Sequence, residues 1–73
     1  MHKYLAYEVM DRSGACAWVN FDNATNCLLG DEVANLAGRR IALYDVPRAN
    51  RNRQAAHVGL VVAQGSSYFL QTY

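Results

Sequence analysis

Two apolar, strand-like runs flank a polar segment near the middle of the chain, and together they require the fold to contain a sheet. Residues 39–46 alternate between two faces, with Ile41 and Leu43 on one of them, and residues 58–63 are almost continuously apolar. Alternation with a period of two is typical of a strand, and a short continuous apolar run is typical of a strand covered on both faces. Residues 47–54 begin with proline and are otherwise mostly polar. We therefore predict a strand, a loop and a second strand.

The positive charge of the chain is concentrated in this stretch. Residues 39–53 hold five of the seven basic residues and a single acid, Asp45. Residues 1–38 hold two basic and five acidic residues, and residues 54–73 hold none of either kind. The net charge of +1 therefore hides a local basic patch, and local charge is what attracts an anionic partner.

The residue types of the basic patch suit an anionic partner. The planar guanidinium of arginine binds phosphate and carboxylate groups through two hydrogen bonds, and the amide of asparagine can bind base edges. We expect the segment from Arg39 to Arg53 to contact a nucleic acid or the acidic face of a protein. A solvated loop that only keeps the protein in solution is the alternative. Arg39 and Arg40 lie at the far end of the strand that precedes the loop, so they join the loop only if the sheet folds back on itself. The candidate binding residues are Arg39, Arg40, Arg48, Arg51, Arg53, Asn50 and Asn52.

The two ends of the chain also have strand patterns. Residues 3–10 alternate between two faces, residues 11–14 (Asp-Arg-Ser-Gly) suit a type I turn, and residues 15–20 form a second run, so we predict an N-terminal hairpin. Residues 67–73 alternate again after a turn at Gly65. Because this last strand ends the chain, we expect it at an edge of the sheet, where an uncharged aromatic strand can pair with another copy.

Residues 22–37 allow two interpretations. Asp22 could cap a helix, Gly38 could end it, and the apolar residues between them recur at helical spacing. Gly30 in the middle costs about 1 kcal/mol relative to alanine in a helix. In the other interpretation, residues 28–33 lead into a further strand. We favour the helix, which gives an α+β fold: a curved antiparallel sheet, made of the N-terminal hairpin and three C-terminal strands, against one short helical segment. The alternative fold is a small all-β, SH3-like barrel of five or six strands.

The size of the chain limits it to one domain, residues 1–73. A chain of this length buries only about 60% of the surface that its unfolded form exposes. Yet 52% of the residues are hydrophobic, so we expect a homo-oligomer, most simply a dimer, to cover the surplus apolar surface. The aromatic residues also suggest an alternative function, in which a face around Trp18 binds a small molecule or serves as a protein-interaction or inhibitor module. The candidate residues of that face are Trp18, Tyr44, Tyr68 and Tyr73.

Nucleophilic or metal chemistry would depend on Cys16, Cys27, His2 and His57. The His-Val-Gly stretch at 57–59 resembles the one that opens a catalytic strand in Cys–His peptidases and amidases, and this resemblance implies His57 as base and Cys16 as nucleophile. It covers three residues, and those enzymes place the cysteine at a helix N-terminus, whereas Cys16 falls in an expected strand. The ten residues between the two cysteines lack the short Cys-x-x-Cys spacing of zinc sites. We therefore expect a binding module without enzyme activity, cofactor or metal.

The N-terminal sequence bears on location. Glu8 interrupts the apolar run that a signal peptide would need, and no apolar stretch approaches the roughly 18 residues of a membrane span. We therefore expect a cytoplasmic protein that does not associate with a membrane. In that compartment Cys16 and Cys27 are expected as free thiols.

Overall fold

The computed structural model describes residues 2–9, 11–45 and 54–73, and for residues 11–16 it describes the backbone alone. In this part of the chain, the sequence-predicted N-terminal hairpin and the three C-terminal strands are present. The elements are β1 (His2–Glu8), β2 (Asp11–Asp22), β3 (Cys27–Leu29), the 3-10 helix η1 (Val33–Leu36), β4 (Arg40–Tyr44), β5 (His57–Gln64) and β6 (Ser67–Thr72).

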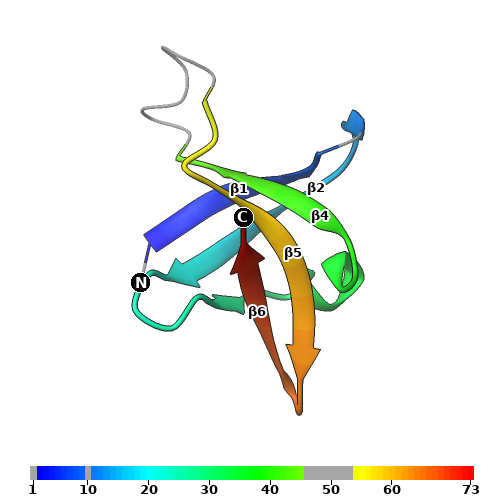
Figure 1. Cartoon of the computed structure of the whole chain (residues 1–73). Helices are drawn as coiled ribbons and strands as arrows, with labels where there is room; N and C mark the ends of the chain where they lie inside the picture. The colour runs from blue at the N-terminus through cyan, green and yellow to red at the C-terminus, as the bar shows by residue number, and fades with distance from the viewer. Residues whose placement is uncertain (1, 10, 46–53) are drawn as a thin grey trace.

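The strands close into an antiparallel barrel in the order β1-β2-β3-β6-β5-β4 (Figure 1). Its wall consists of two three-stranded meanders, β1–β2–β3 and β4–β5–β6. Two ladders between strands far apart in the sequence join the meanders. In one, Leu5 of β1 lies opposite Tyr44 of β4, and in the other, Cys27 of β3 lies opposite Phe69 of β6. Each of these strands therefore has a neighbour on both sides.

The interior of the barrel is filled by the alternate side chains that point inward from each strand. Ile41 and Leu43, which the sequence places on one face, are both 0% exposed. Two further core side chains, Val33 and Leu36, come from η1, which lies between the end of β3 and the start of β4 (Figure 1). The core cluster comprises Tyr4, Ala6, Ala17, Val19, Phe21, Leu28, Val33, Leu36, Ile41, Leu43, Val61 and Leu70.

The predicted α+β fold is wrong, because residues 22–37 form no α-helix. This segment ends β2, turns into β3 and then forms the single 3-10 turn of η1. The expected sheet is antiparallel as predicted, but it closes on itself instead of packing against a helix. The alternative interpretation, a small all-β barrel, agrees with the closed barrel of the described residues, and an SH3-like barrel is compatible with it.

The apolar spacing of this segment resembles a helix for a physical reason. Val33 and Leu36 are three residues apart, and in a helix with three residues per turn such residues lie on the same side. Leu28 is also buried, but it belongs to β3. Gly30, between β3 and η1, has a φ of 156°, which residues other than glycine rarely adopt. The chain bends at this glycine. A strand and a tight turn thus produce the periodicity that the sequence attributes to one helix.

Asp22 caps a turn and not a helix. Its Oδ1 accepts a hydrogen bond from the backbone N–H of Ala24 at 3.0 Å, and its Oδ2 accepts one from the hydroxyl of Thr25 at 3.1 Å. Asn26 donates its backbone N–H to the Asp22 carbonyl at 2.7 Å and has a φ of 63°, which asparagine tolerates better than most residues. These bonds close the connection between β2 and β3.

Two smaller predictions are also wrong. Residues 11–14 belong to β2 and not to a turn, and the register of the β1–β2 ladder shifts between Tyr7 and Glu8. The last strand, β6, is not an edge strand, because it pairs with β5 on one side and β3 on the other. Self-association through a free edge of β6 therefore loses its basis, whereas the argument from the large apolar content remains.

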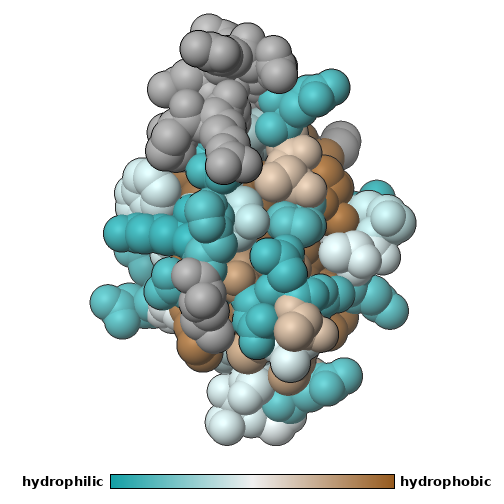
Figure 2. Space-filling view, turned by 90° about the vertical axis from the view of Figure 1, so that its left-hand side faces the viewer, coloured by the Kyte–Doolittle hydropathy of each residue, from teal (hydrophilic) through white to brown (hydrophobic). Residues whose placement is uncertain are grey.

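The surface of the barrel is not uniform. The side seen in Figure 2 is covered mainly by hydrophilic residues, with hydrophobic residues visible between them. Within residues 2–9, 11–45 and 54–73, no helix has the length and apolar character that a membrane crossing requires.

Candidate functional site

The outward side of β1, β2 and β4 carries apolar and aromatic side chains. A strand with one face in the core usually presents polar residues on its other face. Here the strand register aligns an apolar row instead: Trp18 of β2 lies opposite Leu5 of β1, and Leu5 lies opposite Tyr44 of β4. Trp18 itself remains 51% exposed. The outer surface therefore carries apolar area that this chain does not cover.

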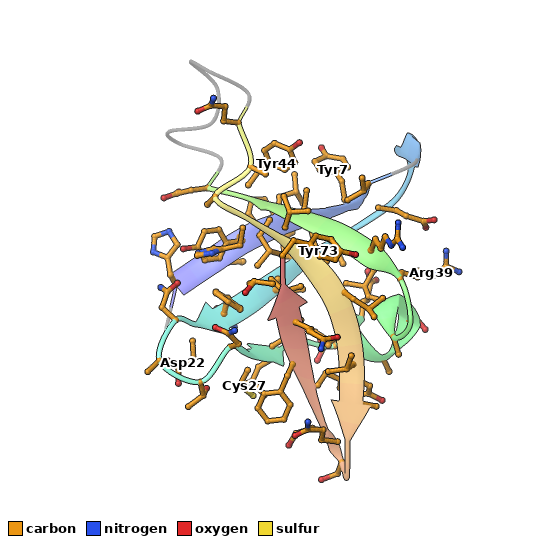
Figure 3. The ribbon with its side chains drawn as sticks, in the orientation of Figure 1. Tyr7, Asp22, Cys27, Arg39, Tyr44 and Tyr73 are labelled. Carbon is orange, nitrogen blue, oxygen red and sulfur yellow. The ribbon has the colours of Figure 1, made fainter. Side chains whose placement is uncertain are left out.

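A second row runs beside the first. Tyr7 of β1 lies opposite Ala42 of β4, and Ala42 lies opposite Val58 of β5. Tyr73 continues the row, since its backbone N–H donates to the Val58 carbonyl at 3.3 Å. The rings of Tyr7 and Tyr44, side by side in Figure 3, meet edge to face with centroids 5.7 Å apart and so connect the two rows. We call this surface the aromatic outer face, and it comprises Leu5, Tyr7, Trp18, Ala42, Tyr44, Val58 and Tyr73.

The apolar run of β5 shows how this face arises. The sequence predicts a strand covered on both sides, because residues 58–63 are apolar almost without interruption. Val61 points into the core and is 1% exposed, whereas Val58 on the outer side is 37% exposed. The prediction of cover on both faces is therefore wrong for the single chain, and the outer half of the run contributes to the aromatic outer face.

A pocket of about 400 Å³ opens beside Trp18, at the margin of the aromatic outer face. One wall comes from β1 and β2, and the other comes from the connection between β3 and η1. The first wall is apolar, and the second carries two carboxylates. The pocket is lined by Leu5, Ala17, Trp18, Asp31 and Glu32.

Gly30 explains how the acidic wall comes so close to β2. A Cβ atom at this position would lie 3.1 Å from the Trp18 carbonyl oxygen and 3.4 Å from a methyl group of Val33. Because glycine has no Cβ, the connection can lie directly against the β2 backbone. Asp31 and Glu32, which follow at once, are thereby held beside the indole.

A cation already lies at this indole. The Nζ of Lys3 is 5.1 Å from the centroid of the Trp18 ring, within the range of a cation–π contact. Asp31 and Glu32 are exposed and form no ion pair with another described residue. The pocket therefore combines an aromatic surface with two carboxylates that form no ion pair with a described residue.

The two described arginines of the predicted basic segment have different roles. Arg39 forms an ion pair with Glu8, with Nη1 and Oε2 2.6 Å apart, and its Nε donates to the Asn35 carbonyl at 3.2 Å. Arg40 is exposed, and its guanidinium carbon lies 6.0 Å from the centroid of the Tyr73 ring. Arg39 therefore links β1 to the η1–β4 connection, and Arg40 forms no ion pair with a described residue.

The other predicted site residues divide into two groups. Tyr68 is a core-facing residue, because it packs against the core cluster and lies opposite Leu28. Trp18, Tyr44 and Tyr73 lie on the aromatic outer face. Outside the described residues, and therefore still predictions, are Arg48, Arg51, Arg53, Asn50 and Asn52.

A cluster of rings lies at the start of β1 and β5. The Phe21 ring is 4.7 Å from His57 and 6.0 Å from Tyr4, and Tyr4 is 5.5 Å from His57, measured between centroids. His2 continues the cluster at 4.6 Å from Tyr4, and its Nε2 is 3.1 Å from Oδ2 of Asp45. Phe21 and Tyr4 are core residues, so these contacts give His57 a packing role at this end of the barrel.

The structure adds little to the catalytic and metal hypotheses. His57 begins β5, as expected, and Cys16 lies in β2, but the side chain of Cys16 is not among those described. Cys27 is a free thiol. In the part of the chain that the structure describes, no group of three or more His, Cys, Asp or Glu side chains could hold a metal ion.

Sequence reasoning missed several residues of the candidate site. The sequence predicts Leu5 and Val58 in strands but not on a binding surface, and it predicts Asp31 and Glu32 in a helix. A usable signal was present in residues 3–9 and 58–63, where both faces of a strand are partly apolar.

Comparison with known families, curated proteins and solved structures finds no match to this chain.

Proposed function

We propose that this chain is a non-enzymatic binding module that contacts a protein partner through its aromatic outer face. The observation that carries the proposal is the alignment of apolar side chains in two rows across β1, β2, β4 and β5, with Trp18 half exposed. Tryptophan and tyrosine are enriched at the centres of protein interfaces. A row of aromatic side chains on the outside of a rigid barrel suits a protein surface better than an enclosed small molecule. A cytoplasmic location remains part of the proposal.

A selection from a random peptide display library tests this function. The bait is the whole chain, and the comparison is with Trp18→Ser, which removes the most prominent ring of the face, and with Phe69→Ser. Phe69 is a partly exposed ring on β6, outside the aromatic outer face, and serves as the matched control. We expect the wild type and Phe69→Ser to enrich the same peptide families and Trp18→Ser to enrich none of them. Thermal unfolding by circular dichroism checks that each bait is folded.

Two results would contradict the proposal. One is a selection in which the wild type enriches no peptide family. The other is enrichment that survives in Trp18→Ser but disappears in Phe69→Ser, which would place the binding surface elsewhere on the barrel.

A second candidate function is contact with an anionic partner through the predicted basic segment. Exposed Arg40 beside the Tyr73 ring supports it, because an arginine and an aromatic ring together can hold a phosphate and a base. Arg39 supports it less, since its guanidinium is engaged by Glu8. Fluorescence polarisation with oligonucleotides over a salt series tests this candidate, with Arg40→Ala and Arg48→Ala/Arg51→Ala/Arg53→Ala as variants. Affinity that falls steeply with salt and is lost in the triple variant is the expected result.

A further inference from the structure

We propose that the pocket beside Trp18 takes an arginine side chain from a basic segment of the protein partner. This inference rests on the proposed function and deepens it, because it names the chemistry of the partner. It depends on three observations about the pocket: its volume and apolar lining, its two carboxylates that form no ion pair with a described residue, and the cation that already lies at the indole.

The shape of the pocket suits a long side chain. Leu5, Ala17 and the indole of Trp18 form the apolar wall of the pocket, which has a volume of about 400 Å³. The methylene stem of arginine can lie on such apolar surface while its charged end reaches polar groups. Asp31 and Glu32 line the same pocket, so a side chain within it has both apolar surface and carboxylates beside it.

The charge of the pocket favours a cation. Asp31 and Glu32 are exposed, and neither forms an ion pair with a described residue. The same charges would repel the phosphates of a nucleic acid, so an anionic partner does not suit this pocket. Lys3 shows that the indole accepts a positive group, because its Nζ lies 5.1 Å from the ring centroid.

Arginine suits the site better than lysine. A planar guanidinium stacks on an aromatic ring and donates two parallel hydrogen bonds to a carboxylate, whereas an ammonium is a compact point charge. A site with an indole on one side and carboxylates on the other can use both properties of the guanidinium at once. We therefore expect a preference for arginine over lysine as well as over uncharged residues.

The experiment uses the fluorescence of Trp18, which is the only tryptophan in the chain and lies in the pocket itself. The probe is a short acetylated and amidated Gly-Arg-Ser-Arg-Gly peptide, and the matched control carries citrulline at both arginine positions. Citrulline keeps the shape of arginine and removes its charge. At low salt we expect saturable binding of the arginine peptide, at least about tenfold weaker binding of the citrulline peptide, and intermediate binding of a lysine peptide.

Three variants locate the binding. Asp31→Asn/Glu32→Gln should weaken binding of the arginine peptide about tenfold at low salt. Asp11→Asn removes one negative charge at the start of β2 and should change binding less than about twofold. Lys3→Gln should strengthen binding about two- to fivefold, because it removes a competing cation from the indole.

The results that would overturn the inference are distinct from those that would overturn the proposed function. Three results would each overturn the inference. They are equal binding of the arginine and citrulline peptides, no binding of the arginine peptide at low salt, and unchanged affinity for this peptide in Asp31→Asn/Glu32→Gln. Library peptides that depend on Trp18 but lack basic residues would also sink it and would leave the proposed function standing. The chain could also self-associate, and both the arginine peptide and Asp31→Asn/Glu32→Gln could abolish that self-association. This result would overturn the inference, because the occupant of the pocket would then be a second copy of this chain and not a different protein.

Discussion

β4 and β5 carry apolar side chains on both of their faces, and the two faces have different surroundings. On the inner face, Leu43 is 0% exposed and Val61 is 1% exposed. On the outer face, Val58 is 37% exposed and lies in a row with Tyr7 and Ala42. The inner residues are enclosed by other residues of the barrel. On the outer face, Val58 is exposed and Tyr7 is partly exposed, whereas Ala42 between them is covered at 6% exposed. The comparison separates residues that stabilise the barrel from residues to which we assign binding only as a proposal.

The largest expected effect lies on the inner face. Leu43→Ala removes a fully buried side chain from the centre of the barrel and should lower the free energy of unfolding by about 2–5 kcal/mol. For a domain of this size such a loss is enough to unfold a substantial fraction of the molecules. Urea denaturation followed by Trp18 fluorescence measures it. A loss below about 1 kcal/mol would mean that the core around Leu43 is less tightly packed than its complete burial indicates.

A glycine on the neighbouring strand β5 sharpens the comparison, because the backbone of β6 occupies the space where a side chain would lie. A Cβ at Gly59 would meet the carbonyl oxygen of Gln71 and would lie 2.9 Å from its carbonyl carbon. Gly59→Ala should therefore force β5 and β6 apart and cost about 2–3 kcal/mol, at the upper end of the range for overpacking. Hydrogen exchange of the β5–β6 ladder should accelerate as well. Unchanged exchange would show that the two strands accommodate the methyl group.

A matched pair on β5 compares the two faces directly. Val61→Thr places a hydroxyl in the core and should lower the free energy of unfolding by about 1–2 kcal/mol. The reason is that the buried hydroxyl gives up its hydrogen bonds to water and gains no partner that the native core provides for it. Val58→Thr makes the same change on the outer face and should stay within about 0.5 kcal/mol. Thermal or urea unfolding of the two variants gives the difference. Equal costs would mean that the outer face is already covered, as in a dimer that is present at the concentration used.

The smallest expected effect concerns the ion pair at the margin. Arg39 and Glu8 join the β4 side of the barrel to β1, but the Arg39 side chain is 52% exposed. A double-mutant cycle with Glu8→Gln and Arg39→Gln should give a coupling of about 0.2–1 kcal/mol that decreases with salt. A coupling well above this range would make the pair a structural lock instead of a weak surface contact.

The parts of the fold that the sequence predicts correctly depend on local alternation. The period of two in residues 3–9 and 39–46 identifies β1 and β4 and the inward side of Ile41 and Leu43. Closure of the barrel depends on pairing between distant strands, as between Leu5 and Tyr44, and no local pattern specifies it. The helix predicted in residues 22–37 fails for a related reason, since a strand and a 3-10 turn bury residues at spacings that match a helix.

The candidate site is less predictable than the fold. Trp18, Tyr44 and Tyr73 can be selected as aromatic residues, but only the register brings them together with Leu5 and Val58. Asp31 and Glu32 gain their significance from Gly30, whose close approach to the β2 backbone is a property of the folded chain. The arginines at 48, 51 and 53 remain a prediction from the sequence.

The two ladders that join the meanders have a consequence for the kinetics of folding. In the β1–β4 ladder Leu5 pairs with Tyr44, and in the β3–β6 ladder Cys27 pairs with Phe69. Each ladder therefore brings together residues about forty positions apart in the sequence. Small barrels dominated by such long-range pairs fold in milliseconds to seconds, far more slowly than helical bundles of equal length. Until both ladders have formed, β1, β3, β4 and β6 each lack a neighbour on one side. The newly synthesised chain is therefore most vulnerable to aggregation before β1 meets β4, and stopped-flow refolding at increasing protein concentration would measure how long that period lasts.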